Sequence, residues 1–232
     1  MRSDVEAEQR DSGPPGPRYI AIDGPSASGK SAVGGRVAER LGYRFIDTGM
    51  MYRAITWLAH ERQIDLEDDA ELTRLAESVE LTLESNQVRV DGHDVTNLLR
   101  TTEVGKAVSL VSRVAGVREA MVRGQRAMAG QGRVVMAGRD IGTVVLPDAP
   151  LKVYLEASAA ERDRRRHEEL RAMGRSVTLQ QVRDELAHRD AIDSERAVSP
   201  LRPAEDAVVI DTDALSLEQV VERILELAPC QS

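Results

Sequence analysis

The segment Gly24-Pro-Ser-Ala-Ser-Gly-Lys-Ser31 combines residue types that bind phosphate through the backbone of a loop. It matches the spacing G-x-x-x-x-G-K-[ST] in full, and a short apolar run precedes it. Glycines let such a loop turn its N–H groups inward around an anion, and a helix that starts where the loop ends adds its partial positive charge. The segment therefore predicts a P-loop that holds the phosphates of a nucleoside triphosphate.

Two side chains of this loop have distinct expected roles. We expect Lys30 to lie along the β- and γ-phosphates as a catalytic point charge and the Ser31 hydroxyl to ligate Mg²⁺. Few of the 31 Lys and Arg residues are lysines, which favours a specific role for Lys30 over a chance glycine-rich turn. The residues expected to bind ATP are Gly24, Pro25, Ser26, Ala27, Ser28, Gly29, Lys30, Ser31 and Ala32.

The elements that must position this loop alternate between predicted strands and predicted helices, as in an α/β fold. Apolar residues at helical spacing follow several of the short apolar runs, which predicts about five parallel strands with helices on both faces of the sheet. The sequence contains no N-K-x-D tetrapeptide for reading guanine, which disfavours a GTPase. The expected strands are residues 19–23, 44–47, 133–137, 151–155 and 207–210.

This alternation of strands and helices is interrupted between about residues 68 and 100. A short helix is followed by two period-2 runs, 81–83 and 88–90, around the polar tip Ser85-Asn86, which predicts an inserted antiparallel patch. Residues 102–130 then predict two helices broken near Gly116.

Composition narrows the function classes. A formal net charge of −8 disfavours a duplex nucleic-acid binder, and no apolar run approaches the roughly 20 residues of a membrane span. The single cysteine, Cys230, gives no disulfide framework. We therefore expect a cytoplasmic monomer with no nucleic-acid or membrane partner, whose Pro- and Gly-rich residues 1–17 form a flexible tail.

Further segments resemble bacterial cytidylate kinase. They are Ile22-Asp-Gly-Pro-Ser26, Asp47-Thr-Gly-Met-Met-Tyr-Arg53, Gly138-Arg-Asp-Ile-Gly-Thr-Val-Val145 and Arg189-Asp-x-x-Asp-Ser-x-Arg196, and the similarity runs from about Tyr19 to Leu227. The resemblance implies transfer of the γ-phosphoryl group of ATP, with Mg²⁺, to CMP or dCMP. It also implies a nucleoside-monophosphate-kinase fold within residues 18–230, with a core (about 18–60, 100–157 and 205–230), an acceptor-binding insert (about 61–99) and a helical lid (about 158–200).

The resemblance also implies roles for individual residues. Arg53 and Arg139 resemble the arginines that grip the acceptor's phosphate, as a planar guanidinium can hold two phosphate oxygens. Tyr52 either stacks near the acceptor or packs in the core. The residues that resemble base readers are Thr48, Arg118, Asp140 and Arg196, and those that resemble the sugar-binding set are Ser109, Arg189 and Asp193.

Asp140 carries the argument for cytosine. A carboxylate accepts from the exocyclic amine of cytosine, whereas uracil would turn a carbonyl toward it, a mismatch of roughly 1 to 3 kcal/mol. Arginine and hydroxyl donors would meet the ring acceptors. The alternative for Arg118 and Arg196 is a pair of solvated surface charges on helices rich in acidic residues.

Six arginines lie between Glu161 and Arg175. In a kinase this is where a lid would close over ATP, and we expect Arg162 and Arg166, one helical turn apart, to be its catalytic arginines. An ordinary solvated helix face is the alternative.

Two residues depart from the family pattern, because Ala137 stands where the family often has an acidic residue and Met50 replaces a small one. The competing functions are a kinase for UMP or a non-nucleotide such as shikimate, and a binding module that uses ATP only as a switch.

Overall fold

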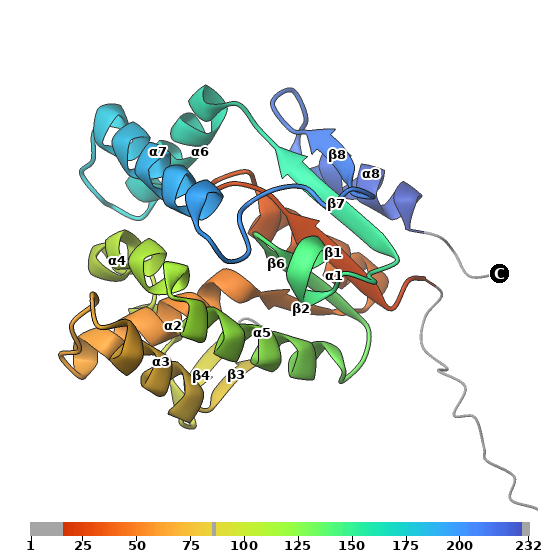
Figure 1. The fold of residues 1–232 in the computed structure, drawn as a ribbon. Helices are drawn as coiled ribbons and strands as arrows, with labels where there is room; N and C mark the ends of the chain where they lie inside the picture. The colour runs from red at the N-terminus through yellow and green to blue at the C-terminus, as the bar shows by residue number, and fades with distance from the viewer. Residues whose placement is uncertain (1–15, 85–86, 229–232) are drawn as a thin grey trace, which may run out of the picture.

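The chain is described by a computed structural model that covers residues 16–84 and 87–228. Its core is a five-stranded parallel sheet in the order β2-β6-β1-β7-β8 (Figure 1). The α/β prediction is confirmed. The predicted tail up to residue 15, the tip Ser85-Asn86 and Cys230 lie outside the described residues. The strands are β1 (Tyr19–Asp23), β2 (Arg44–Asp47), β6 (Val134–Gly138), β7 (Leu151–Glu156) and β8 (Val208–Asp211).

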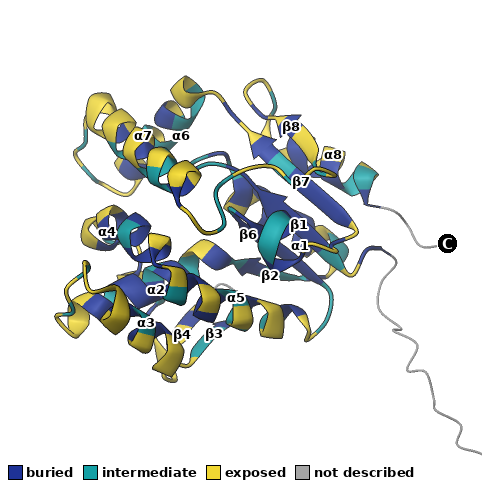
Figure 2. Cartoon of the chain, in the orientation of Figure 1, coloured by how far each residue is buried: buried dark blue, intermediate teal, exposed yellow. Residues whose placement is uncertain are grey.

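Helices cover both faces of this sheet, as its buried apolar strands require. One face packs Ile20, Ile22 and Val135 against α1 (Lys30–Leu41) and α8 (Leu217–Leu227). The other packs Ala21 and Met136 against α2 (Thr48–Glu61) and α5 (Ala115–Ala129). Figure 2 shows β1, β6 and β7 mostly dark blue, as the buried centre of the sheet, whereas the edge strand β8 is largely exposed.

The inserted patch is a separate antiparallel sheet with the order β3-β4-β5. It comprises β3 (Leu81–Glu84), β4 (Gln87–Val90) and the two-residue β5 (His93–Asp94), a strand that the sequence pattern did not predict. It follows α3 (Asp69–Ser78) and leads through the 3₁₀ turn η1 (Thr96–Leu98) into α4 (Thr102–Arg113).

The predicted break between two helices near Gly116 is confirmed, and it lies at Val114. Val114 adopts extended angles (φ −67°, ψ 120°) and separates α4 from α5, so Gly116 lies inside α5. A Cβ at Gly116 would stand 2.3 Å from the Thr73 side chain of α3. The glycine therefore permits close packing of α3 on α5 rather than ending a helix.

The segment after β7 forms a pair of helices, α6 (Ala159–Ala172) and α7 (Leu179–Glu195). They share a small core of Leu170, Val182 and Leu186, separate from the two cores of the sheet. Figure 1 shows the pair side by side, facing α4 from beyond the end of the sheet. We refer to residues 158–200 as the lid segment.

Candidate active site

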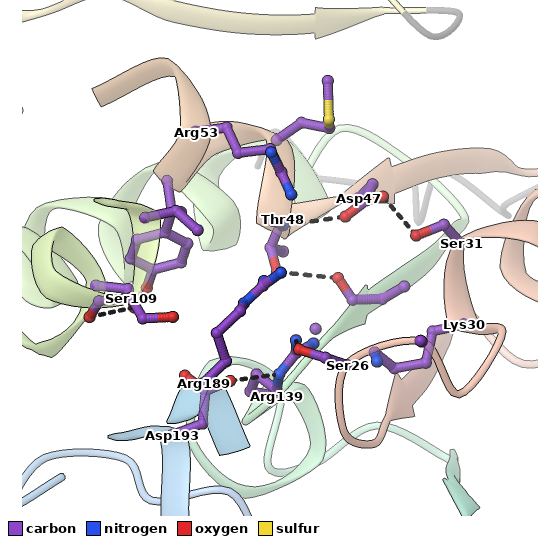
Figure 3. A pocket seen from close by; sticks show the side chains of 18 of the residues that line it. Ser26, Lys30, Ser31, Asp47, Thr48, Arg53, Ser109, Arg139, Arg189 and Asp193 are labelled. Carbon is purple, nitrogen blue, oxygen red and sulfur yellow. Dashed lines mark hydrogen bonds and ion pairs between the residues drawn. The ribbon is translucent and has the colours of Figure 1, made fainter. Parts of the chain in front are cut away.

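The site lies where three parallel strands end. Because β1, β2 and β6 run in the same direction, the residues that follow Asp23, Asp47 and Gly138 meet at one edge of the sheet. They line a cavity of about 400 Å³ together with residues of α2, α4, α5 and the lid segment. Figure 3 shows the labelled side chains from these elements converging on this cavity.

The predicted P-loop joins β1 directly to α1. Gly24 has φ +151°, and a Cβ there would stand 2.3 Å from the Leu155 carbonyl oxygen, so only glycine fits. Ala27 also has positive φ (59°), which is strained for a residue with a Cβ. The chain is thus bent tightly around the point where α1 begins.

Lys30 is buried at the start of α1 and points back over the loop. Its Nζ donates to the Pro25 carbonyl oxygen at 2.5 Å and to Ser28 Oγ at 3.3 Å. Burial, together with the nearby positive charge of Arg139, holds the pKa of Lys30 well below its ordinary value. A phosphate group beside this ammonium would relieve that cost, so the position favours an anionic ligand.

Ser31 and Asp47 face each other across the adjacent part of the cavity (Figure 3). Ser31 Oγ donates to Asp47 Oδ2 at 2.6 Å, while Asp47 Oδ1 accepts from the Gly49 N–H and caps α2. The P-loop serine therefore shares its hydroxyl proton with a carboxylate at the end of β2.

Arginines crowd one part of the cavity. Burial, with Arg189 and Arg166 nearby, lowers the pKa of Arg53 to about 10, and burial, with Arg139 nearby, lowers the pKa of Arg189. Arg53 donates one hydrogen bond to the Leu99 carbonyl oxygen at 3.1 Å. The Nε atoms of Arg166 and Arg189 are buried without a hydrogen-bond partner. This end of the site has excess positive charge, as a pocket for phosphate groups would.

The opposite end has paired charges instead. Arg118 donates to Asp140 in a fully buried ion pair, and Arg196 lies 3.9 Å from the same carboxylate. The Arg118 guanidinium also lies over the Tyr52 ring, 5.3 Å from its centroid. The solvated-surface alternative for Arg118 and Arg196 was therefore wrong. Their helices are exposed on other faces, but these two side chains point inward.

Asp193 links the two ends. Its carboxylate accepts from Arg139 Nε at 2.9 Å and lies 3.5 Å from Arg196. Burial opposes its ionisation, but Arg139 and Arg196 outweigh burial and hold the pKa of Asp193 below its ordinary value. Arg139 continues the chain by donating to Ser26 Oγ of the P-loop at 2.9 Å.

The lid segment reaches the P-loop through Arg162. Its guanidinium donates to the Ser26 carbonyl oxygen at 3.3 Å and pairs with Asp190 of α7. Arg166 lines the cavity directly. Arg175, between the two lid helices, donates to Thr102 Oγ1 at 3.1 Å and to the Arg100 carbonyl oxygen, which ties the lid to the start of α4.

The structure brings most of the predicted site residues to this one cavity. Gly24, Pro25, Ser28 and Arg162 are not among its lining residues, although each lies in or contacts the P-loop. Those that line it are Ser26, Ala27, Gly29, Lys30, Ser31, Ala32, Thr48, Tyr52, Arg53, Ser109, Arg118, Arg139, Asp140, Arg166, Arg189, Asp193 and Arg196.

Sequence reasoning missed several residues at this site. Asp47 was quoted only as part of a family segment, although a carboxylate at a strand end beside a P-loop is a recognisable signal. Arg100 and Arg175 line the cavity, and no spacing rule marked them. Asp190 lies next to the predicted Arg189 and was passed over.

The donors near Ser31 fit a magnesium ion bound with a nucleotide. A serine hydroxyl and a carboxylate are oxygen ligands of the kind that Mg²⁺ prefers, and the cavity beside them is open to phosphates. Within residues 16–84 and 87–228 no group of three or more His, Cys, Asp or Glu side chains could hold a metal by itself. In the same ranges no helix is long and apolar enough to span a membrane.

Comparisons with known proteins agree with this geometry. The family model described as cytidylate kinase matches residues 20–229. The chain belongs to the cytidylate kinase family. Cytidylate kinase of Geobacillus sp. (strain WCH70) is 51% identical over 212 residues, covering 90% of this chain and 95% of that protein. Cytidylate kinase of Bacillus velezensis is 50% identical, with 92% of this chain and 97% of that protein covered.

Family members also occur within longer proteins. A bifunctional pantoate ligase/cytidylate kinase of Synechococcus sp. (strain JA-3-3Ab) is 47% identical over 232 residues, covering 95% of this chain but 43% of that protein. Among solved structures, shikimate kinase of Bacteroides thetaiotaomicron aligns at 16% identity with a TM-score of 0.45, covering 90% of this chain and 97% of that one. That likeness is too distant to bear on the acceptor.

Proposed function

We propose that this protein transfers the γ-phosphoryl group of ATP to CMP or dCMP, giving ADP and CDP or dCDP. The observation that supports this most directly is the division of one cavity into a cation-rich end beside the P-loop and a paired, buried end around Asp140. Two phosphorylated ligands would meet at the first end, and a base would be read at the second.

ATP is held by residues 24–32, with Lys30 alongside its β- and γ-phosphates. The acceptor's phosphate is gripped by Arg53 and Arg139, whose guanidinium groups present two donors each. Its oxygen is already ionised near pH 7, so in-line transfer needs no strong base. Ser31 would hold the Mg²⁺ that accompanies ATP, and that ion would supply positive charge to neutralise the phosphates.

The base is read by Asp140, Arg118, Arg196 and Thr48. Asp140 keeps free lone pairs beside its bond to Arg118 and accepts from the cytosine amine. Thr48 Oγ1 donates to the Ala137 carbonyl oxygen at 2.9 Å, so it offers the ligand an acceptor rather than the donor we expected. Ser109, Arg189 and Asp193 hold the sugar, and Tyr52 packs beneath the base.

The lid segment closes over the transferring group. Arg162 and Arg166 bring positive charge to the phosphates, and the contact of Arg175 with the start of α4 holds the lid segment against this edge of the cavity. We further propose that residues 61–99 form the acceptor-binding insert, within a domain of residues 18–230 whose core is about 18–60, 100–157 and 205–230.

The proposed setting is pyrimidine nucleotide metabolism in the cytoplasm. We propose a monomer, and the net charge of −8 suits small phosphorylated partners rather than nucleic acid or membrane.

A panel of acceptors in a coupled ADP-release assay tests the function. CMP and dCMP should give the highest kcat/KM, with UMP, AMP and shikimate each at least tenfold lower. Preference for UMP or shikimate would contradict the reading of Asp140. ADP release that ignores every acceptor would support the ATP-switch alternative instead.

A further inference from the structure

Asp47 stands apart from the other carboxylates of the cavity. The four that line it are Asp47, Asp140, Glu169 and Asp193. Three of these pair with arginines: Asp140 with Arg118, Asp193 with Arg139, and Glu169 with Arg166. Among the described residues Asp47 has no such ion pair, and its hydrogen bonds come from the Ser31 hydroxyl and the Gly49 N–H. Its negative charge acts on the nearby Lys30 and Arg53, but it is not committed to a direct ion pair and can also act on a bound cation.

The bond from Ser31 to Asp47 defines which way the serine oxygen faces. A hydroxyl can ligate a cation through its oxygen only if its proton points elsewhere, and Asp47 Oδ2 accepts that proton at 2.6 Å. A partner of this kind fixes a ligand's rotamer and raises its basicity. Asp47 is itself fixed, because its second oxygen caps α2 through Gly49.

The neighbouring strand explains why this carboxylate matters in this chain. β6 lies between β1 and β2, and at this edge of the sheet it carries Ala137, which has no carboxylate to offer a cation. Asp47 is the register partner of Ala137. The carboxylate that β6 lacks thus has a counterpart one strand away, at the same level of the sheet edge and already bonded to the P-loop serine.

We propose that Asp47 is the residue that positions Mg²⁺ in this protein. It accepts the Ser31 proton, turns the serine oxygen toward the cation, and supplies the negative charge that Ala137 cannot. This rests on the proposed use of ATP with Mg²⁺ and assigns part of that site to a residue outside the P-loop.

Asp47→Asn isolates this role, because asparagine keeps an oxygen that can cap α2. Its amide nitrogen would replace Oδ2 and donate to Ser31 Oγ, so the hydroxyl proton would lose its acceptor and compete with the cation for the remaining positions around the oxygen. The measurement is calorimetric affinity for ATP in excess Mg²⁺ and in excess EDTA, with no acceptor present. The Mg²⁺-dependent gain in affinity should fall at least tenfold in the variant. Affinity for metal-free ATP should stay the same or rise, since a negative charge near the phosphates is gone.

A matched control separates this role from capping. Asp68 caps α3 through the Glu71 N–H at 2.8 Å and lies outside the cavity, so Asp68→Asn should leave both affinities unchanged. Equal weakening of both affinities in Asp47→Asn would mean a structural role and would overturn the proposal. A full Mg²⁺ gain in that variant, or no Mg²⁺ gain in the wild type, would overturn it too. A wild-type protein that bound no ATP at all would refute the proposed function itself.

Discussion

The two ends of the cavity differ in whether their buried charges are paired. At the phosphate end, Lys30 is buried and Arg53 and Arg189 are partly buried, other cations lie near each of them, and the pKa of each is lowered. At the base end, Arg118 and Asp140 are both buried but neutralise each other. The difference shows that the first end is completed only by its anionic ligands, whereas the second is already formed and selects by hydrogen bonding.

The largest expected effect concerns the phosphate end of the cavity. Lys30→Ala should lower kcat about 10³-fold, since the charge along the transferring phosphates is lost. The melting temperature should not fall, because burial of the Lys30 charge is costly, as its lowered pKa indicates. Lys106→Ala, at an exposed position of α4, is the control and should retain wild-type turnover. Comparable turnover in both variants would contradict the role of Lys30.

The lid segment adds positive charge to the phosphate end of the cavity. Two arginines of α6 allow a functional contact to be distinguished from an ordinary surface charge. Arg162 contacts the P-loop, whereas the partners of Arg164 among the described residues are Glu161 and Glu168 on its own helix. Arg162→Ala should lower kcat about 10²-fold, and Arg164→Ala should change it less than twofold. Steady-state kinetics at saturating ATP and CMP decides, and equal effects would support the solvated-face alternative.

The paired end should control the choice of base without controlling phosphate binding. Asp140→Asn should lower the ratio of kcat/KM for CMP over UMP by about 10- to 100-fold, or 1 to 3 kcal/mol, because an amide can donate to the uracil carbonyl. Arg53→Lys should lower kcat/KM for CMP and UMP alike, since it touches the shared phosphate. If Arg53→Lys altered the CMP/UMP ratio as much as Asp140→Asn, the division of the cavity would be wrong.

The smallest expected effect concerns Asp23, which lies where the two ends meet. It accepts from the backbone N–H groups of Ile141 and Gly142 in η2 (Ile141–Val145), the π-helical turn after Asp140. Burial raises the pKa of Asp23 to about 6. The folded state then holds its proton more tightly than the unfolded state, so its contribution to stability falls as pH rises from about 4 to 6 and is constant above.

Asp23→Asn removes this titration. The unfolding free energy of the variant, relative to wild type, should rise by about 1 kcal/mol between pH 5 and pH 7. Urea unfolding at both values measures the difference. Parallel pH profiles for the two proteins would show that the pKa of Asp23 is not raised.

The order of helices and strands was predictable from sequence because the apolar runs and the P-loop are local patterns, each visible within a few consecutive residues. The predicted start of β6 at Arg133 and end of the last strand at Ile210 differ from the structure by one residue. The burial of Arg118 was not predictable from α5 alone, because its neighbour Glu119 is exposed and the pocket comes from other elements. Contacts such as Arg162 with Ser26 depend on how the lid packs, which no local pattern encodes.

The first two turns of α2 combine three proposed roles: positioning of Mg²⁺, contact with the base and binding of the acceptor's phosphate. The residues that have these roles all lie at or just after the start of the helix, and they are Asp47, Thr48, Tyr52 and Arg53. A rigid helix cannot change one of these positions independently: a single inserted residue would rotate every later side chain by about 100°. Changes of acceptor in related proteins should therefore arise by exchanging side chains on this helix, and deletions or insertions within it should abolish activity toward every acceptor at once.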